Sequence, residues 1–309
     1  MSGELKIFAG NSHQGLAKVI VASLGMELGR SETHEKPNEN LEVRIMENVR
    51  ESDVFYIQTA CSPLHSNIFE MFIAIDALKS ASARRVTAVI PYMPYVRADK
   101  KDRPRISISV RLFADLLVAS GADRVLTIDL HAPQVQGFFR VPTDQLMAAG
   151  IICDYLCRKD LSNAVIIAAD AGEAKDVGRY ANRLDLPIGI IDKRRFNGQR
   201  QSVDLIGDVE GKLALVIDDE ISSAQTLVEA ANYLIAKGAK DVKAVATHGA
   251  FSGNALELIE ASPVSEVIVT DSIPMSTKSD KITVLSVGGL FARAIQRIHD
   301  GNSVSALFR

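Results

Sequence analysis

The chain of 309 residues is long enough for two domains of ordinary size, and its 47% hydrophobic and 24% charged residues are typical of globular proteins. Its 35 basic and 38 acidic residues leave a net charge of -3, which excludes a global positive field that would hold nucleic acid or an anionic membrane. Any binding of phosphate groups must therefore depend on a local group of residues rather than on the overall charge.

The three cysteines, Cys61, Cys153 and Cys157, are too few for a disulfide framework, and none lies at a zinc-ligand spacing. The first eight residues carry no basic-then-apolar signal, and no apolar run approaches the roughly 18 residues that a membrane span needs. We therefore predict reduced thiols and a soluble, cytoplasmic protein with no nucleic-acid or membrane partner.

Short apolar runs alternate with longer amphipathic stretches along the chain, which is the pattern of βαβ units. Most runs are apolar on both faces, as in a parallel sheet that helices cover on each side. In chain order, the predicted strands are residues 6–9, 54–59, 86–92, 125–130, 164–169, 188–191, 213–217, 242–247, 267–270 and 282–287.

The βαβ pattern occurs twice, and an Ala-Ala-Gly sequence at residues 148–150 interrupts it between the two halves. This predicts two tandem α/β domains, residues 1–147 and residues 148–309. The basic segment at residues 193–202 contains Asn197 and Gly198, so it predicts a mobile loop suited to cover an active site.

Polar residues follow four of the predicted strands, and ligands of open parallel sheets bind at the carboxyl ends of the strands. One such group is the charged segment 97–103, and another contains Asp129 and His131. Together with Asp170 at a third strand end, His131 could hold a divalent ion that carries nucleotide phosphates. A lone histidine at a strand end is more often structural, so that alternative stays open.

The fourth group is Asp218 and Asp219, followed by the hydroxyl-rich segment 222–226 and a predicted helix that runs on to residue 236. Backbone amides and hydroxyls at a helix start favour an anion, and the helix dipole adds to this. The two carboxylates could bind a sugar diol or hydrated Mg²⁺. The alternative is an acidic strand end followed by a serine N-cap.

Lys193 and Arg195 follow another predicted strand, where a run of basic residues is by default a solvated surface. In that position they could instead neutralise the oxygens of a transferring phosphoryl group. A Walker-type kinase is excluded because residues 207–212 have the wrong spacing and no hydroxyl follows Lys212.

Over nearly its whole length the chain resembles the ribose-phosphate diphosphokinases, also called phosphoribosyl pyrophosphate synthetases. The most specific match is residues 129–142, DLHAPQVQGFFRVP, which follows the signature of that family position by position. Further matches, in the order and spacing of the family, are residues 8–11, 91–92 with Arg97, 99–103, 192–195, 207–209 and 246–249.

The resemblance implies two tandem domains of the type I phosphoribosyltransferase fold, each a mainly parallel sheet flanked by helices. It also implies a homo-oligomer, either a hexamer or a dimer. The implied reaction transfers the diphosphoryl group of ATP, with Mg²⁺ as cofactor, to the C1 hydroxyl of ribose 5-phosphate.

The resemblance assigns roles to residues that match the family motifs. Lys193 and Arg195 would be catalytic, and His131 and Asp170 would bind the metal. Nucleotide binding is implied for Arg97, Asp99, His131 and Asn38. Ribose 5-phosphate binding is implied for Asp218, Asp219, Ser222, Ser223, Ala224, Gln225 and Thr226.

Several binding positions depart from the family pattern. Ser222 replaces a carboxylate, Gln225 a glycine, Ala98 a glutamine and Glu173 a glycine. The segment 35–40, which contains Lys36, lacks the aromatic residue that the family has in this region. Three hypotheses therefore stay open: an active synthetase with an altered nucleotide site, a catalytically silent homologue that regulates a true synthetase, and an enzyme for a different sugar phosphate or nucleotide.

Overall fold

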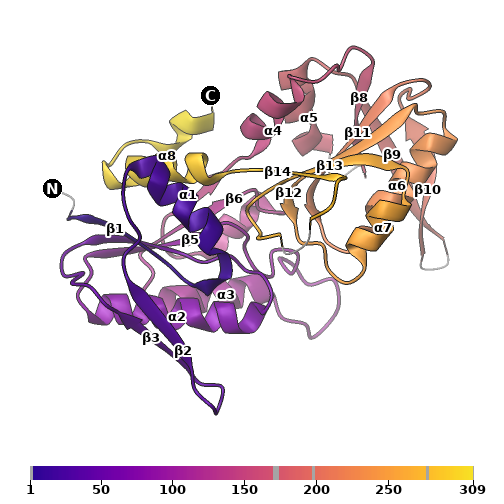
Figure 1. Cartoon of the computed structure of the whole chain (residues 1–309). Helices are drawn as coiled ribbons and strands as arrows, with labels where there is room; N and C mark the ends of the chain where they lie inside the picture. Colours follow the sequence, from indigo (N-terminus) through magenta and orange to yellow (C-terminus); the bar gives the residue numbers. More distant parts are fainter. Residues whose placement is uncertain (1–2, 170–173, 197–198, 276–277, 309) are drawn as a thin grey trace. The chain divides into compact units, whose positions relative to one another are not determined.

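The computed structural model describes residues 3–169, 174–196, 199–275 and 278–308, which form two compact units (Figure 1). Unit 1 contains Met1–Met147, Ser272–Pro274 and Ser286–Arg309, and unit 2 contains Ala148–Asp271 and Met275–Leu285. The chain therefore returns to unit 1 for its last helix. The division expected from the sequence, at residues 1–147 and 148–309, does not include that return.

Unit 1 is built on a five-stranded parallel sheet with the strand order β1-β4-β5-β6-β7. The strands are β1 (Leu5–Ala9), β4 (Asp53–Ile57), β5 (Arg85–Ile90), β6 (Arg124–Ile128) and β7 (Thr143–Leu146). The first four confirm predicted strands. β7 was not predicted, because its sequence TDQL has no apolar pattern.

Helices cover both faces of this sheet (Figure 1). They are α1 (Gln14–Leu24), α2 (Leu64–Ser80), α3 (Ser109–Ala119) and α8 (Gly288–His299), with the short 3-10 helices η1 (Asn11–His13), η2 (Pro133–Phe138) and η3 (Val304–Phe308). Because successive strand residues point to opposite faces, Phe8 and Tyr56 pack with α2 and α3, while Ile7 and Phe55 lie buried on the face of α1 and α8.

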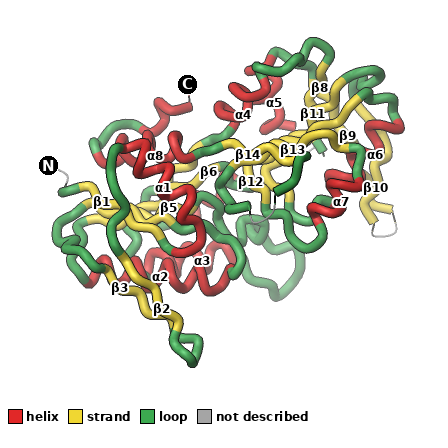
Figure 2. Tube along the Cα trace, viewed as in Figure 1, coloured by secondary structure: helices red, strands yellow, loops and turns green. Residues whose placement is uncertain are grey.

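A separate antiparallel hairpin, β2 (Ser31–Glu35) and β3 (Leu41–Ile45), packs against α2. Figures 1 and 2 show that its turn extends beyond the helix. Val43 of β3 belongs to the core of unit 1 and anchors the hairpin there. The sequence did not predict these strands, because β2 reads SETHE and has no buried apolar face.

Unit 2 is built on a seven-stranded sheet that is parallel except for its outermost pair, β10 and β9. In spatial order the strands are β10 (Gln199–Ile206), β9 (Ile188–Phe196), β8 (Ala164–Ala168), β11 (Leu213–Ile221), β12 (Asp241–Gly249), β13 (Val264–Thr270) and β14 (Ile282–Leu285). The prediction of a mobile loop at residues 193–202 is wrong for residues 193–196 and 199–202, which belong to the paired strands β9 and β10.

The helices of unit 2 are α4 (Ala149–Leu156), α5 (Ala174–Leu184), α6 (Gln225–Ala236) and α7 (Ala255–Ala261). Leu227 and Leu234 of α6 and Ile259 of α7 pack on strand residues such as Val216 and Val267. The fold class predicted from the sequence, tandem α/β units with mainly parallel sheets, is confirmed. Within the residues that the structure describes, no helix is both long and apolar enough to cross a membrane.

Candidate active site

In unit 1, the candidate nucleotide-binding residues follow two neighbouring strands at the same edge of the sheet. Arg97 and Asp99 lie on the segment after β5, and His131 lies between β6 and η2. The Nε2 amide of Gln134, in η2, donates a hydrogen bond to Asp99 Oδ2 at 3.1 Å. This bond joins the two segments, so the structure brings Asp99 close to the motif that contains His131.

The side chains of Arg97 and His131 are exposed, and that of Asp99 is half-buried. Asp129, two residues before His131, has a φ of 38°, and its backbone N–H donates to the carbonyl of Leu146 at 3.1 Å. Positive φ values are uncommon outside glycine and often occur at functional sites. The strand therefore ends in a sharp turn that leaves His131 at the surface.

Asn38 lies on a different segment, at the exposed turn of the β2–β3 hairpin. Its Oδ1 accepts a hydrogen bond from the backbone N–H of Asn40 at 3.4 Å. Next to it, Lys36 forms an ion pair with Glu42 at 2.5 Å, and the hydrogen bond from Lys36 lowers the pKa of the Glu42 carboxyl. Lys36 thus stabilises the base of the turn.

In unit 2, Asp218 and Asp219 are half-buried. The sequence placed them after a strand ending at residue 217, and that boundary is wrong because β11 continues to Ile221. The backbone N–H of Asp219 donates to Asp218 Oδ1 at 2.8 Å, which fixes the first carboxylate. The pair lies near the carboxyl end of a central strand, where ligands of parallel sheets bind.

The segment between β11 and α6 is a tight connection. Ser222 Oγ and Ser252 Oγ lie 2.9 Å apart, and the N–H of Ser252 donates to the carbonyl of Ser222 at 3.0 Å. The N-cap residue is Ala224, whose φ is 60°, and no side chain caps the helix. The serine N-cap alternative is therefore wrong, because the N-cap side chain is a methyl group that cannot accept a hydrogen bond from the first turn of α6.

Ser223, Gln225 and Thr226 are exposed around this helix start, and Ala224 is buried beneath it. Because amides at a helix start carry partial positive charge, the segment 222–226 is suited to an anion. The half-buried Asp218 and Asp219 precede it on β11. The arrangement can bind a molecule with a phosphate at one end and hydroxyl groups further along.

Three predicted residues cannot be placed in this geometry. Asp170 lies outside the described residues. Lys193 and Arg195 lie in β9, in register with Ser202 and Arg200 of β10, and their side chains lie outside the described part of the chain.

The sequence did not single out two buried ionisable residues near the same sheet edge. Glu220 of β11 is 6% exposed and His248 of β12 is 3% exposed. The two are register partners in adjacent parallel strands, so their side chains point to the same face. The available signals were the glutamate that follows the acidic pair and the histidine within the match at residues 246–249.

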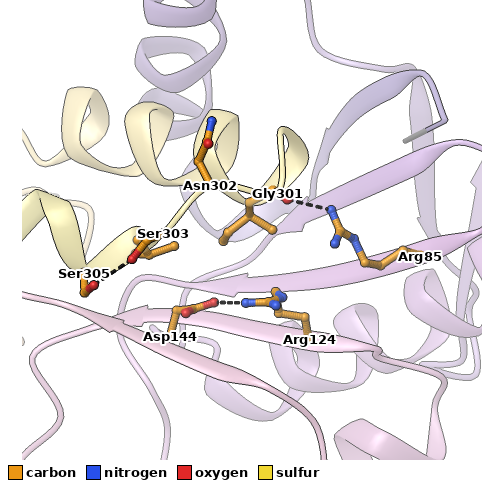
Figure 3. A pocket seen from close by; sticks show the side chains of 9 residues that line it. Arg85, Arg124, Asp144, Gly301, Asn302, Ser303 and Ser305 are labelled. Carbon is orange, nitrogen blue, oxygen red and sulfur yellow. Dashed lines mark hydrogen bonds and ion pairs between the residues drawn. The ribbon is translucent and has the colours of Figure 1, made fainter. Parts of the chain in front are cut away.

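A cavity of about 420 Å³ lies elsewhere on unit 1 (Figure 3). Arg85 and Arg124 line it, and they are the first residues of β5 and β6, so the cavity lies at the amino ends of the strands. Arg124 pairs with Asp144, and Arg85 Nε donates to Asp53 at 2.7 Å. The cavity is separate from the carboxyl ends where the candidate site lies.

Among the described residues, no cluster of three histidine, cysteine or acidic side chains could by itself hold a metal ion. Mg²⁺ usually keeps several waters and binds through one or two carboxylates together with substrate phosphates. A magnesium ion that arrives with a polyphosphate substrate would therefore need only one or two side chains of the protein as ligands.

Two family models match the chain. Residues 5–121 match the N-terminal domain of ribose phosphate pyrophosphokinase, and residues 194–309 match a phosphoribosyl synthetase-associated domain. Two proteins named ribose-phosphate pyrophosphokinase are similar along their whole length. The one from Caldanaerobacter subterraneus is 46% identical over 99% of this chain and 98% of its own, and the one from Deinococcus radiodurans is 47% identical over 98% of each.

A solved structure is also similar. The phosphoribosylpyrophosphate synthetase from Mycobacterium smegmatis shares 36% sequence identity and a TM-score of 0.92, over 97% of this chain and 100% of that one.

The mainly parallel sheets, with candidate binding residues near the carboxyl ends of their strands, define a two-unit protein of the α/β class. The comparisons narrow the class further. The chain belongs to the ribose-phosphate pyrophosphokinase family, which confirms the resemblance drawn from residues 129–142.

Proposed function

We propose that this chain transfers the diphosphoryl group of ATP to the C1 hydroxyl of ribose 5-phosphate, giving phosphoribosyl pyrophosphate and AMP. Its membership of the family supports the reaction type. The observation that carries the proposal is that the start of α6, which its N-cap side chain does not cap, follows Asp218 and Asp219 in the chain by a few residues, which suits a sugar phosphate.

On the sugar side, the backbone amides of residues 222–226 would hold the 5-phosphate, with Ser222, Ser223 and Thr226 adding hydroxyl groups. The carboxylates of Asp218 and Asp219 would accept hydrogen bonds from the ribose hydroxyls. Two anchors at opposite ends of the sugar fix its orientation, and they leave the C1 hydroxyl available for the reaction.

On the nucleotide side, Arg97 would contact the phosphates, while Asp99 and Asn38 would bind other parts of ATP. His131 and Asp170 would hold Mg²⁺ with the polyphosphate, and the bound ion would supply charge neutralisation. Arg97 and His131 are exposed, as residues that await a substrate should be.

In the reaction, the C1 oxygen forms a bond to the β-phosphorus, and the bond between that phosphorus and the α,β-bridging oxygen breaks. AMP leaves with the bridging oxygen, and the C1 hydroxyl loses its proton. Lys193 and Arg195 would neutralise the charge that develops on the transferring group. Such transfers depend mainly on positioning and electrostatic stabilisation.

An AMP-release assay with ribose 5-phosphate and MgATP tests the proposal, and the expected result is AMP that depends on both substrates. AMP release with another sugar phosphate but not with ribose 5-phosphate would favour an altered substrate. No AMP at high enzyme concentration, together with a changed rate of an added active synthetase, would favour a silent regulatory homologue.

We also propose that the chain forms a homo-oligomer, a dimer or a hexamer, through α2 and α3. Phe69 is 61% exposed, and Leu112 and Leu116, one turn apart on α3, are 50% and 47% exposed. The ring of Phe69 packs on Phe72, which packs on Phe113, so the apolar surface is continuous across the two helices. A second copy of the chain would cover this surface.

A cytoplasmic location, and the absence of nucleic-acid and membrane partners, stay predictions. The nearly balanced charge supports them, since no excess of basic residues is present to attract anionic polymers. Fractionation of cells tests the location.

A further inference from the structure

Glu70 of α2 is a charged residue in the core of unit 1, with only 2% of its surface exposed. Its carboxylate accepts hydrogen bonds from the N–H of Asn11 at 3.2 and 3.1 Å, from Thr33 Oγ1 at 2.7 Å and from Gln58 Nε2 at 2.6 Å. A buried charge is costly unless it is hydrogen-bonded, and these donors satisfy both oxygens. The donors come from three segments: Asn11 follows β1, Thr33 lies in β2 and Gln58 follows β4.

The network continues beyond the carboxylate. Gln58 Oε1 accepts a hydrogen bond from Ser12 Oγ at 2.7 Å, and Ser12 Oγ accepts one from the N–H of Thr59 at 2.9 Å. Thr59 Oγ1 in turn accepts from the N–H of Tyr92 at 3.0 Å. The bonds therefore run without interruption from the β2 strand to the start of the segment that contains Arg97 and Asp99.

The surroundings of this network leave little room for displacement. A Cβ atom on Gly10 would lie 2.4 Å from Gln58 Oε1 and 2.6 Å from the hydroxyl of Tyr56. Burial, together with the negative charge of Glu70, raises the pKa of the Tyr56 hydroxyl well above its usual value. A side chain at position 10 would therefore displace the Gln58 amide or the Tyr56 hydroxyl.

The hairpin has an additional anchor that does not depend on Glu70. Val43 of β3 is buried in the apolar core together with Met71 and Ile75 of α2. Apolar packing attaches the hairpin to α2, while the bond between Thr33 and Glu70 fixes where β2 lies along it. Loss of that bond should therefore shift the hairpin without detaching it.

We infer that Glu70 is a positioning residue for the nucleotide half of the site, because its network sets the places of the hairpin that carries Asn38 and of the segment that carries Arg97. The inference rests on the proposed function, which assigns both residues to ATP. A displacement of about 1 Å in a positioning group can cost 10²-fold in rate, so such a network affects binding without touching the substrate.

Two variants test this role. Glu70→Gln keeps the size of the side chain but places an amide group against the hydrogen-bond donors that surround Glu70. It should raise the KM for MgATP about tenfold, while the KM for ribose 5-phosphate stays within about twofold. Thr33→Val removes only the hairpin bond and should shift the KM for MgATP in the same direction by about threefold. Glu266→Gln, which alters a hydrogen-bonded carboxylate in unit 2, is the matched control and should leave the KM for MgATP unchanged.

Equal changes in both KM values, or no change in the KM for MgATP, would overturn the inference. If the wild-type chain releases no AMP, the proposed function fails, and hydrogen–deuterium exchange of residues 31–45 then decides the role of Glu70. Faster exchange there in Glu70→Gln, with α3 unchanged, is the expected result. Unchanged exchange in residues 31–45 would contradict the inference whatever the activity.

Discussion

At the scale of single residues, exposure separates the candidate binding residues from the supporting ones. Arg97, His131 and Thr226 are exposed, whereas Glu70 and Glu220 are almost completely buried. An exposed polar residue contributes little to folding, so its replacement should affect function alone. Replacing a buried and hydrogen-bonded residue changes both stability and function. A kinetic test of such a residue therefore needs a second measurement, such as hydrogen–deuterium exchange.

His131→Ala should lower kcat/KM for MgATP by about 10²-fold, because the variant loses a group that would hold the metal and the polyphosphate. The melting temperature should stay within about 1 °C, since the side chain is exposed. Steady-state kinetics and thermal denaturation check both values. His65→Ala, another exposed histidine of unit 1, is the control and should leave the kinetics unchanged.

The sequence could single out much of the candidate site at this scale, because the motif at residues 129–142 and the acidic pair in β11 lie in continuous stretches. It could not predict the bond between Gln134 and Asp99 or the network of Glu70, because those contacts join residues at least 35 positions apart or on separate elements. The only local sign of Glu70 was an acidic residue on the apolar side of α2.

At the scale of elements, unit 2 contains a second carboxylate network, centred on the half-buried Glu266, that links α4 to its sheet. Burial opposes ionisation of Glu266, but hydrogen bonds from Lys159, Lys243, Tyr155 and Thr283 outweigh it and lower the pKa from 4.5 to about 2. The ionised carboxylate therefore stabilises the folded state at pH values above 4.5, and that contribution is lost as the pH falls towards 2.

Glu266→Gln should lower the free energy of unfolding by about 2 kcal/mol at pH 7, since two lysines lose their counter-charge. The difference from wild type should shrink as the pH falls below about 4.5. Denaturant unfolding at several pH values measures it. Glu257→Gln, an exposed residue of α7, is the control, and a difference between Glu266→Gln and wild type that does not depend on pH would contradict the account.

Apolar runs predicted the central strands of both sheets, because burial on two faces requires them. Three of the missed strands, β2, β7 and the outer strand β10, have polar sequences without a continuous apolar run. The fourth, β3, alternates apolar and charged residues over only five positions. Edge strands and hairpins are held by backbone pairing and by contacts with other elements. Their sequences therefore need not show the pattern.

At the scale of the whole molecule, the sequence pattern could not predict that the chain returns to unit 1. α8 continues the alternation of the second half, yet it packs with α1 from the start of the chain. Local patterns show that a helix forms, whereas its partner depends on packing between distant segments.

Leu112→Glu should dissociate the proposed oligomer, since a charge would lie in an apolar interface that excludes water. Sedimentation velocity should show a smaller species than the wild type, with unchanged circular dichroism. Ile235→Glu, on an exposed position of α6, is the control and should leave the assembly intact. A wild-type chain that sediments as a monomer would contradict the proposal.

The most direct test of the central claim is a phosphorus NMR spectrum of the products formed from MgATP and ribose 5-phosphate. We predict AMP together with a sugar that carries a diphosphate at C1, in equal amounts. Formation of ADP with a sugar monophosphate at C1, or no product at all, would contradict the claim that this chain transfers a diphosphoryl group.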